Sequence, residues 1–215
     1  MNPSEEYVFP KRGFKSKNRS LLAAMTNKQS HEDGTLSDEE ITWLTRRAKD
    51  GFGIVTTAAS HVSELGKGWI GEMGVWSDDH LEGLTKLASS LKQHGSLNLV
   101  QIFHGGMKAP FEINNVIPVC PSKMMNESTG KLLARDLKTD EIHQLIEDFS
   151  DAAKRCEDAG FDGIEVHGAH SYLISQFLGL KTNRRTDEFG GSIENRFRFL
   201  REIILSIRKK TNDDF

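Results

Sequence analysis

The sequence has few cysteines and no long apolar run, and each absence excludes a class of protein. Two of the 215 residues are cysteine, Cys120 and Cys156, and their spacing fits neither a zinc motif nor a redox CxxC motif. We therefore expect two free thiols in a reducing cytoplasm rather than a disulfide-stabilised secreted fold. No apolar stretch approaches the ~18 residues of a membrane helix, and the polar N-terminus does not resemble a signal peptide.

An excess of one charge is also missing. The 28 Lys and Arg residues and 31 Asp and Glu residues are mixed along the chain and leave a net charge of −3. No basic block favours a nucleic acid as partner, and no acidic tail suggests a disordered arm. With 37% hydrophobic residues, the composition is that of a globular protein with a sizeable core. We expect residues 1–215 to belong to one domain.

Short apolar runs alternate with longer amphipathic segments. The apolar runs predict four β-strands, over residues 19–26, 52–59, 97–104 and 162–168. The amphipathic segments predict four helices, over residues 36–51, 76–95, 139–160 and 192–210. Four such units predict a parallel sheet covered by helices, in the α/β class. Right-handed crossovers place all the strand C-termini on one face, where open sheets and barrels bind their ligands.

Details of the helices can also be predicted. Ser37 followed by Glu40 predicts a capping box at the start of the first helix, and Gly51 predicts its end. Ser77 is the expected cap of the second helix. In the last helix, the apolar stripe predicts a core-facing side made of Phe197, Leu200, Ile204 and Ile207.

Polar side chains gather where the predicted strands end. Side chains alternate along a strand, so Glu165 and His167 share the face of the fourth strand that its apolar residues do not occupy. Gln101 and Thr26 lie at the corresponding ends of the third and first strands. One such residue alone is more often a satisfied buried group, but polar ends on three strands favour a ligand site.

Two long connections leave the same face. Residues 105–138 show little periodicity, and a loop of this length is usually a lid, a binding loop or disordered. The stretch 179–196, "GLKTNRRTDEFGGSIENR", carries both arginines and carboxylates. It suits either a loop that pairs its own charges or direct contact with a ligand.

The segment "HGAHSY" offers a specific chemistry. Two imidazoles, His167 and His170, can each donate one N–H to an oxygen between them and stabilise the negative charge of an enolate. The phenol of Tyr172 is a poor base but can donate a proton to a carbanion-like carbon. The alternative is a zinc-dependent hydrolase, with a metal site built from His104, His167 and His170.

The segments "NRSLLAAMTN", "GFGIVTTAA", "LVQIFHGGMKA" and "GFDGIEVHGAHSYLISQFLGLKTNRRTDEFGGSIENRFRFLREII" occur in the order seen in one family. They resemble the Old Yellow Enzyme family of FMN-dependent oxidoreductases. The resemblance implies a (β/α)8 TIM barrel with non-covalent FMN at its C-terminal mouth. It also implies NAD(P)H as reductant and hydride transfer to an activated alkene, such as an enone, an enal or a quinone-like substrate.

The resemblance assigns roles to particular residues. Tyr172 matches the proton donor, and His167 and His170 match the pair that binds the substrate carbonyl. The implied flavin contacts are Ala24, Met25, Thr26, Ala58 and Gln101.

The sequence also departs from the family pattern. Met107 stands where the family usually has Arg, Ser171 where it has Gly, and Ala24 where it has Pro. A complete barrel needs about 250 residues, so we expect an N-terminal half of the barrel, inactive by itself. Its open sheet edges would favour a homo-oligomer, or a non-catalytic assembly module. In such a half-barrel we expect the inward side chains to lose their opposing layer, among them Leu22, Leu99 and Phe103.

Overall fold

A parallel four-stranded sheet forms the centre of the computed structural model, which describes residues 2–11 and 13–215. Its strand order is β3-β4-β5-β9, the order of the strands along the chain. The strands are Leu21–Leu22 (β3), Ile54–His61 (β4), Leu97–Phe103 (β5) and Gly163–Val166 (β9). This is the arrangement that consecutive β/α units of a barrel produce, so the predicted half-barrel architecture is confirmed.

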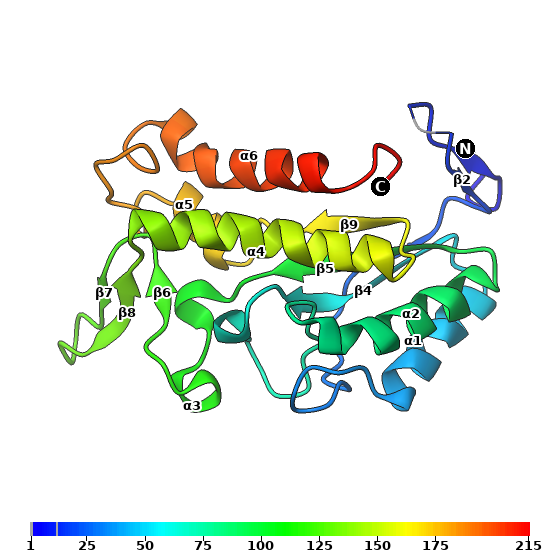
Figure 1. Ribbon diagram of the computed structural model, residues 1–215, viewed down its shortest axis with the longest axis horizontal. Helices are drawn as coiled ribbons and strands as arrows, with labels where there is room; N and C mark the ends of the chain where they lie inside the picture. Colours follow the sequence, from blue (N-terminus) through cyan, green and yellow to red (C-terminus); the bar gives the residue numbers. More distant parts are fainter. Residues whose placement is uncertain (1, 12) are drawn as a thin grey trace.

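A layer of helices covers one face of the sheet (Figure 1). The long helices are Asp38–Lys49 (α1), Leu81–Lys92 (α2), Thr139–Asp158 (α4) and Ile193–Lys210 (α6). Between the layers, Val100 and Ile102 of β5 are fully buried together with Leu87 and Phe149 from the helices. Burial of each such side chain stabilises the fold by roughly 1.5–3 kcal/mol.

Helix caps fix where these helices begin. The Ser37 hydroxyl accepts a 3.1 Å hydrogen bond from the backbone N–H of Glu40, as predicted. The Glu40 carboxylate does not return this bond, because it accepts from Asn27 at 3.0 Å and from Ser30. Only half of the predicted capping box therefore forms. The predicted cap Ser77 starts a 3-10 helix, Asp78–His80 (η2), that leads directly into α2.

The predicted buried stripe of α6 is partly wrong. Phe199, Ile203 and Ile207 are the buried residues of this helix, whereas Phe197 and Ile204 are each 42% exposed. The helix carries apolar residues on two sides, and α4 and α5 (Leu173–Leu178) cover only one of them. Apolar spacing alone cannot show which of two apolar sides faces the core.

The long connection after β5 contains regular structure that the sequence did not predict. It begins with a 3-10 turn at Gly106–Lys108 (η3) and a short helix at Phe111–Asn114 (α3). A small sheet of order β6-β8-β7 follows, made of Val119–Cys120 (β6), Met124–Met125 (β7) and Leu132–Asp136 (β8). Strands this short carry too few alternating positions to stand out in a sequence.

The remaining elements lie near the N-terminus and after β4. They are a two-stranded hairpin and a 3-10 turn, at Tyr7–Val8 (β1), Lys15–Ser16 (β2) and Glu64–Gly66 (η1). In the described part of the chain, no helix combines the length and the apolar character needed to cross a membrane. Cys120 and Cys156 are buried and free, as predicted.

Candidate active site

The carboxyl ends of β5 and β9 bring a cluster of rings together. His167 directly follows β9, and its backbone N–H donates to the Ile102 carbonyl of β5 at 3.0 Å. Its ring centroid lies 5.0 Å from that of His170 and 5.2 Å from that of Tyr172, both nearly perpendicular to it. The three side chains predicted from "HGAHSY" therefore converge. We call His167, His170 and Tyr172 the His–His–Tyr cluster.

A tight turn produces this convergence. His170 and Ser171 both have positive φ angles, 55° and 58°, a conformation that L-residues other than glycine rarely adopt. The turn reverses the chain after β9, so that Tyr172 becomes the residue preceding α5. The backbone N–H of Leu173 then donates to the His104 carbonyl at 3.0 Å. Backbone contacts to β5 thus hold both ends of the turn.

Hydrogen bonds define the tautomers of the two imidazoles. The Nδ1 atom of His167 accepts from the backbone N–H of Ala169 at 3.2 Å, so its proton resides on Nε2. This Nε2 lies 3.2 Å from Nδ1 of His170, which must therefore accept. The proton of the exposed His170 ring is then on Nε2, where it remains available to a ligand. A ligand oxygen can use the His167 donor only by replacing the bond between the two rings.

Burial favours the uncharged forms of His167 and Tyr172. It lowers the pKa of His167, and the neighbouring His170 lowers it further. Burial also raises the pKa of the Tyr172 phenol, and Glu72 raises it further by a smaller amount once it is ionised. At neutral pH His167 and Tyr172 therefore offer an imidazole N–H and a phenol O–H, both of them donors.

Aromatic and basic side chains surround the phenol. The Phe103 ring meets Tyr172 edge to face at 4.8 Å and stacks against Trp69 at 5.4 Å. The Nζ atom of Lys108 lies 5.4 Å from the centroid of the Tyr172 ring and donates to the His170 carbonyl at 2.8 Å. The phenol thus lies between an apolar wall and a cation.

The predicted flavin contacts fall into two separate groups. Gln101 lies on β5 in register with Glu165 of β9, and its amide donates to that carboxylate. Ala58 is 4% exposed and lies in the register shift of β4 between Thr56 and Ala59. The predicted first strand is shorter than expected, so the second group, Ala24, Met25 and Thr26, extends beyond β3. Since β4 separates β3 from β5, these residues do not join the His–His–Tyr cluster.

The side chains of both groups are accessible to a flavin ring, except that of the buried Ala58. Met25 is 50% exposed and Thr26 is also exposed, so their side chains are open to a ligand. Gln101 is half-buried, and its amide both donates and accepts, as the pyrimidine edge of a flavin requires.

The alternative zinc site does not form. Within residues 2–11 and 13–215, no group of three or more His, Cys, Asp or Glu side chains is arranged to hold a metal ion. His104 is instead committed to its own loop, where its Nδ1 accepts from the N–H of Gly106 at 2.9 Å. Burial lowers the pKa of His104 to about 4. In the described residues, the alternative set of His104, His167 and His170 is therefore not arranged as a metal centre.

A buried acid beside this site could not be recognised from the amino-acid pattern. Oε1 of Glu72 lies 2.9 Å from Nδ1 of His61, with both side chains at most 2% exposed. The contact lacks hydrogen-bond geometry, and neither atom has another hydrogen-bond partner in the described residues. Burial raises the pKa of Glu72 to about 9 and lowers that of His61 to about 3. The two residues are 11 positions apart across a loop, and no periodic pattern joins them.

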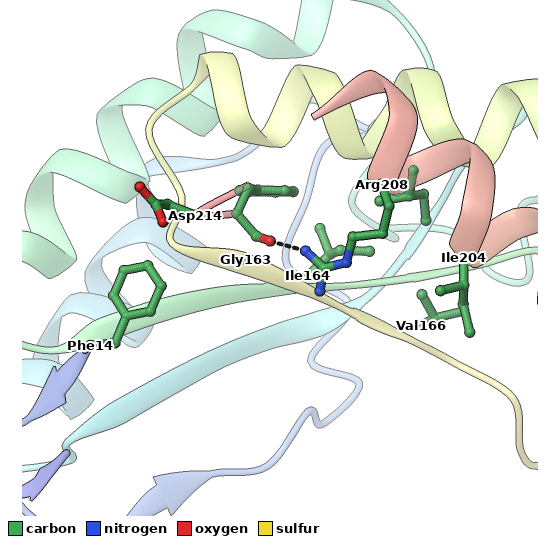
Figure 2. A pocket seen from close by; sticks show the side chains of 9 residues that line it. Phe14, Gly163, Ile164, Val166, Ile204, Arg208 and Asp214 are labelled. Carbon is green, nitrogen blue, oxygen red and sulfur yellow. Dashed lines mark hydrogen bonds between the residues drawn. The ribbon is translucent and has the colours of Figure 1, made fainter. Parts of the chain in front are cut away.

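A separate groove borders the free edge of β9 (Figure 2). Its cavity of about 390 Å³ is lined by Ile164 and Val166 of β9 and by Ile204 and Arg208 of α6. Arg208 donates to the carbonyl oxygen of Phe215, as the dashed line in Figure 2 shows. None of the His–His–Tyr residues lines this groove, so it is distinct from the candidate active site.

These features define a class: β/α-barrel enzymes with a ligand site at the carboxyl ends of the strands. The sequence profile of the NADH:flavin oxidoreductase / NADH oxidase family matches residues 13–215. The chain belongs to this family, which confirms the expected FMN cofactor and NAD(P)H reductant at the level of the family.

Individual relatives support this assignment. The chain is 38% identical over 221 residues to a probable NADH-dependent flavin oxidoreductase, YqiG, of Bacillus subtilis (strain 168), covering 99% of this chain and 58% of that protein. It is similar in structure to 2-naphthoyl-CoA reductase in complex with 2-naphthoyl-CoA, with a TM-score of 0.93, 34% identity and coverage of 100% of this chain and 34% of that one.

An old yellow enzyme homologue from Zymomonas mobilis matches with a TM-score of 0.85 and 30% identity, covering 98% of this chain and 61% of that one. The resemblance to the Old Yellow Enzyme family is therefore confirmed. The chain spans between one third and about three fifths of the length of these three proteins.

Proposed function

We propose that the protein to which these residues belong is an FMN-dependent oxidoreductase. It takes reducing equivalents from NAD(P)H and reduces an alkene activated by a neighbouring carbonyl, as in an enone, an enal or a quinone-like compound. The observation that carries this proposal is the convergence of His167, His170 and Tyr172 at the carboxyl end of a parallel sheet in this family. Bound FMN would supply the hydride chemistry, which no side chain of the cluster can perform.

The cluster suits the carbonyl half of this reaction. The Nε2–H groups of His170 and His167 donate to the substrate oxygen and stabilise the negative charge that develops there. Tyr172, whose raised pKa keeps its phenol protonated, donates a proton to the carbon beside the carbonyl. Gln101, Ala58 and the segment from Ala24 to Thr26 hold the flavin ring.

Phenol binding tests the histidine pair. Titration of p-hydroxybenzaldehyde into the flavin-loaded protein should produce a long-wavelength charge-transfer band. His167→Ala combined with His170→Ala should abolish it, because the phenolate oxygen loses both donors. An unchanged band in the double variant would show that the pair does not bind the substrate oxygen.

Rapid kinetics tests the tyrosine. Tyr172→Phe should slow alkene reduction by about 10²- to 10⁴-fold but leave flavin reduction by NAD(P)H unchanged, since only the first needs the proton. Tyr7→Phe, at the remote β1–β2 hairpin, is the matched control. If both half-reactions slow equally, Tyr172 has a structural role instead.

Residues 1–215 expressed alone should bind FMN weakly and should associate. β3 and β9 each pair on one side only, and their free edges can pair with another chain. The two buried free thiols suit the cytoplasm, where we propose that the protein works. Light scattering should show oligomers. The absorption spectrum should lack a flavin band near 450 nm. A monomer with sub-micromolar FMN affinity would contradict this proposal.

A further inference from the structure

Gln176 of α5 is a buried amide in contact with the turn that carries the His–His–Tyr cluster. Its side chain is 1% exposed, although most glutamines lie at the surface. It belongs neither to the cluster nor to the predicted flavin contacts. A polar group this deeply buried must have hydrogen-bond partners, and their identity shows what the residue does.

The Gln176 amide joins two loops. Its Nε2 donates to the Ser171 carbonyl at 2.7 Å and to the Gly105 carbonyl at 3.3 Å. Its Oε1 accepts from the backbone N–H of Met107 at 3.1 Å. One side chain thereby connects the turn after β9 to the loop after β5, and it uses both donors and its acceptor to do so.

The geometry of the loop leaves space for this amide. Gly106 has a φ angle of +59°, and a Cβ atom there would collide with the Gln176 side chain. Glycine at this position therefore serves both the backbone conformation and the approach of the amide. The contact between Gly106 and the Gln176 amide is therefore complementary in shape, unlike a chance hydrogen bond at the surface.

The turn needs such an anchor because two consecutive residues are in the left-handed region. His170 and Ser171 hold φ angles that cost free energy in any residue with a Cβ atom. Their carbonyls are both held from outside: that of His170 by Lys108 at 2.8 Å, and that of Ser171 by Gln176. Lys108 is exposed and Gln176 is buried, so the buried amide is the stronger constraint.

We propose that Gln176 is a positioning residue: its amide holds the left-handed turn at His170 and Ser171 and thereby sets the orientation of His170 and Tyr172 toward the ligand. The inference rests on the proposed function for the identity of that ligand. It concerns a side chain outside the His–His–Tyr cluster and the predicted flavin contacts, which acts through the backbone of Ser171 and of the loop after β5.

The test uses the whole FMN-loaded protein to which these residues belong, with two substitutions that keep the size of the side chain. Gln176→Glu loses both donors, and Gln176→Met loses every hydrogen bond. The matched control is Gln93→Glu, at the exposed C-terminal end of α2. Carbon-13 labels in histidine and tyrosine report the His170 and Tyr172 rings, and p-hydroxybenzaldehyde reports the assembled site.

We expect the His170 and Tyr172 signals to shift in both Gln176 variants but not in the control. The Kd for p-hydroxybenzaldehyde should rise about tenfold, as the loss of the one buried hydrogen bond to the turn, at the Ser171 carbonyl, implies. Adding Ser171→Gly should restore both readouts, because glycine holds the left-handed turn without an anchor. A residue that only stabilised the fold would lower the melting temperature and leave ring signals and Kd unchanged below it.

The other outcomes of these experiments also decide whether Gln176 positions the cluster. Unchanged signals and an unchanged Kd in folded Gln176→Met would overturn the inference, and so would a failure of Ser171→Gly to restore them. If Gln176→Glu does not fold, Gln176→Met alone supplies the same readouts, and wild-type signals in that variant decide against positioning. If the unsubstituted protein binds no phenol, the proposed function fails, while the ring signals still test the positioning by Gln176.

Discussion

The two faces of the central sheet differ in what they require from their side chains. On the helix-covered face, Val55, Val100 and Ile102 are completely buried. On the opposite face, Leu21 is 44% exposed, and Leu99 and Gln101 are half-buried. Apolar packing against helices defines the first face, whereas the second is open to a ligand or to further chain. Stability and function are therefore assigned to opposite sides of the same strands.

The open face also changes along the strands. Leu21 and Leu99 lie toward the amino ends and remain exposed or half-buried, whereas Phe103, at the carboxyl end of β5, is fully buried by Trp69 and Tyr172. Phe103 was therefore wrongly predicted to lose its opposing layer. Leu22 was also wrongly predicted, because it faces the helices at 7% exposure and Leu21 occupies the open face. The loops complete this face only where the site lies.

The largest predicted difference between the faces is in stability. Ile102→Ala should lower the free energy of unfolding by about 2–5 kcal/mol, because it leaves a cavity between sheet and helices. Leu99→Ala, on the same strand but on the open face, should cost about 1 kcal/mol or less. Urea unfolding of both variants measures the difference. Equal losses would show that association of chains covers the open face in solution.

The helix-covered face was predicted well, because the spacing of apolar residues along a helix follows a simple rule. Repeated apolar positions showed where α1, α2 and α4 lie and which of their residues are buried, such as Leu44 and Phe149. In α6 the same rule failed at Phe197 and Ile204, because apolar residues also occupy the side beside the open edge. A pattern can identify an apolar side but not the neighbour that covers it.

The open face was predicted only where strand ends carry polar residues. His167, His170 and Tyr172 lie within six positions of one another, so their convergence followed from one short segment. The contact between Glu72 and His61 depends on the path of a loop, and the contacts of Gln176 depend on two loops at once. Sequence periodicity has no means of showing such contacts.

The second prediction is that the free energy of unfolding depends on pH through the buried carboxyl group of Glu72. Its pKa rises from 4.5 to about 9 in the folded state, so between these values the folded protein holds a proton that the unfolded chain has lost. Stability is therefore highest at the low end of this range and falls as pH rises, by up to about 1.4 kcal/mol per pH unit. Glu72→Gln should remove this fall, so its stability relative to the unsubstituted protein should increase steadily from pH 5.5 to pH 8.5.

His61 sets the acidic limit of the same prediction. Its pKa falls from 6.5 to about 3 on folding, so stability is lost as pH decreases through this range. Between pH 4.5 and 6.5 the two effects oppose each other, and stability should be nearly constant. Chemical unfolding at pH 5.5, 7 and 8.5 measures the profile, with Glu82→Gln on the surface of α2 as control. A Glu72→Gln variant that declines with alkaline pH as steeply as the unsubstituted chain would contradict the role of Glu72.

The smallest expected effect concerns the turn at the carboxyl end of the open face. Ser171→Gly should stabilise the protein by about 1 kcal/mol, because glycine adopts the φ angle of 58° without the clash of a Cβ atom. The greater freedom of glycine in the unfolded chain offsets part of this gain. Asn115→Gly, at the end of α3 with a φ angle of 55°, is the matched control and should gain less, since asparagine tolerates this conformation. Urea unfolding compares the two variants. A Ser171→Gly protein no more stable than the Asn115→Gly protein would mean that the bonds from Gln176 and Lys108 to the turn already compensate for its strain, and that stability on the open face is set by these anchors rather than by backbone preference.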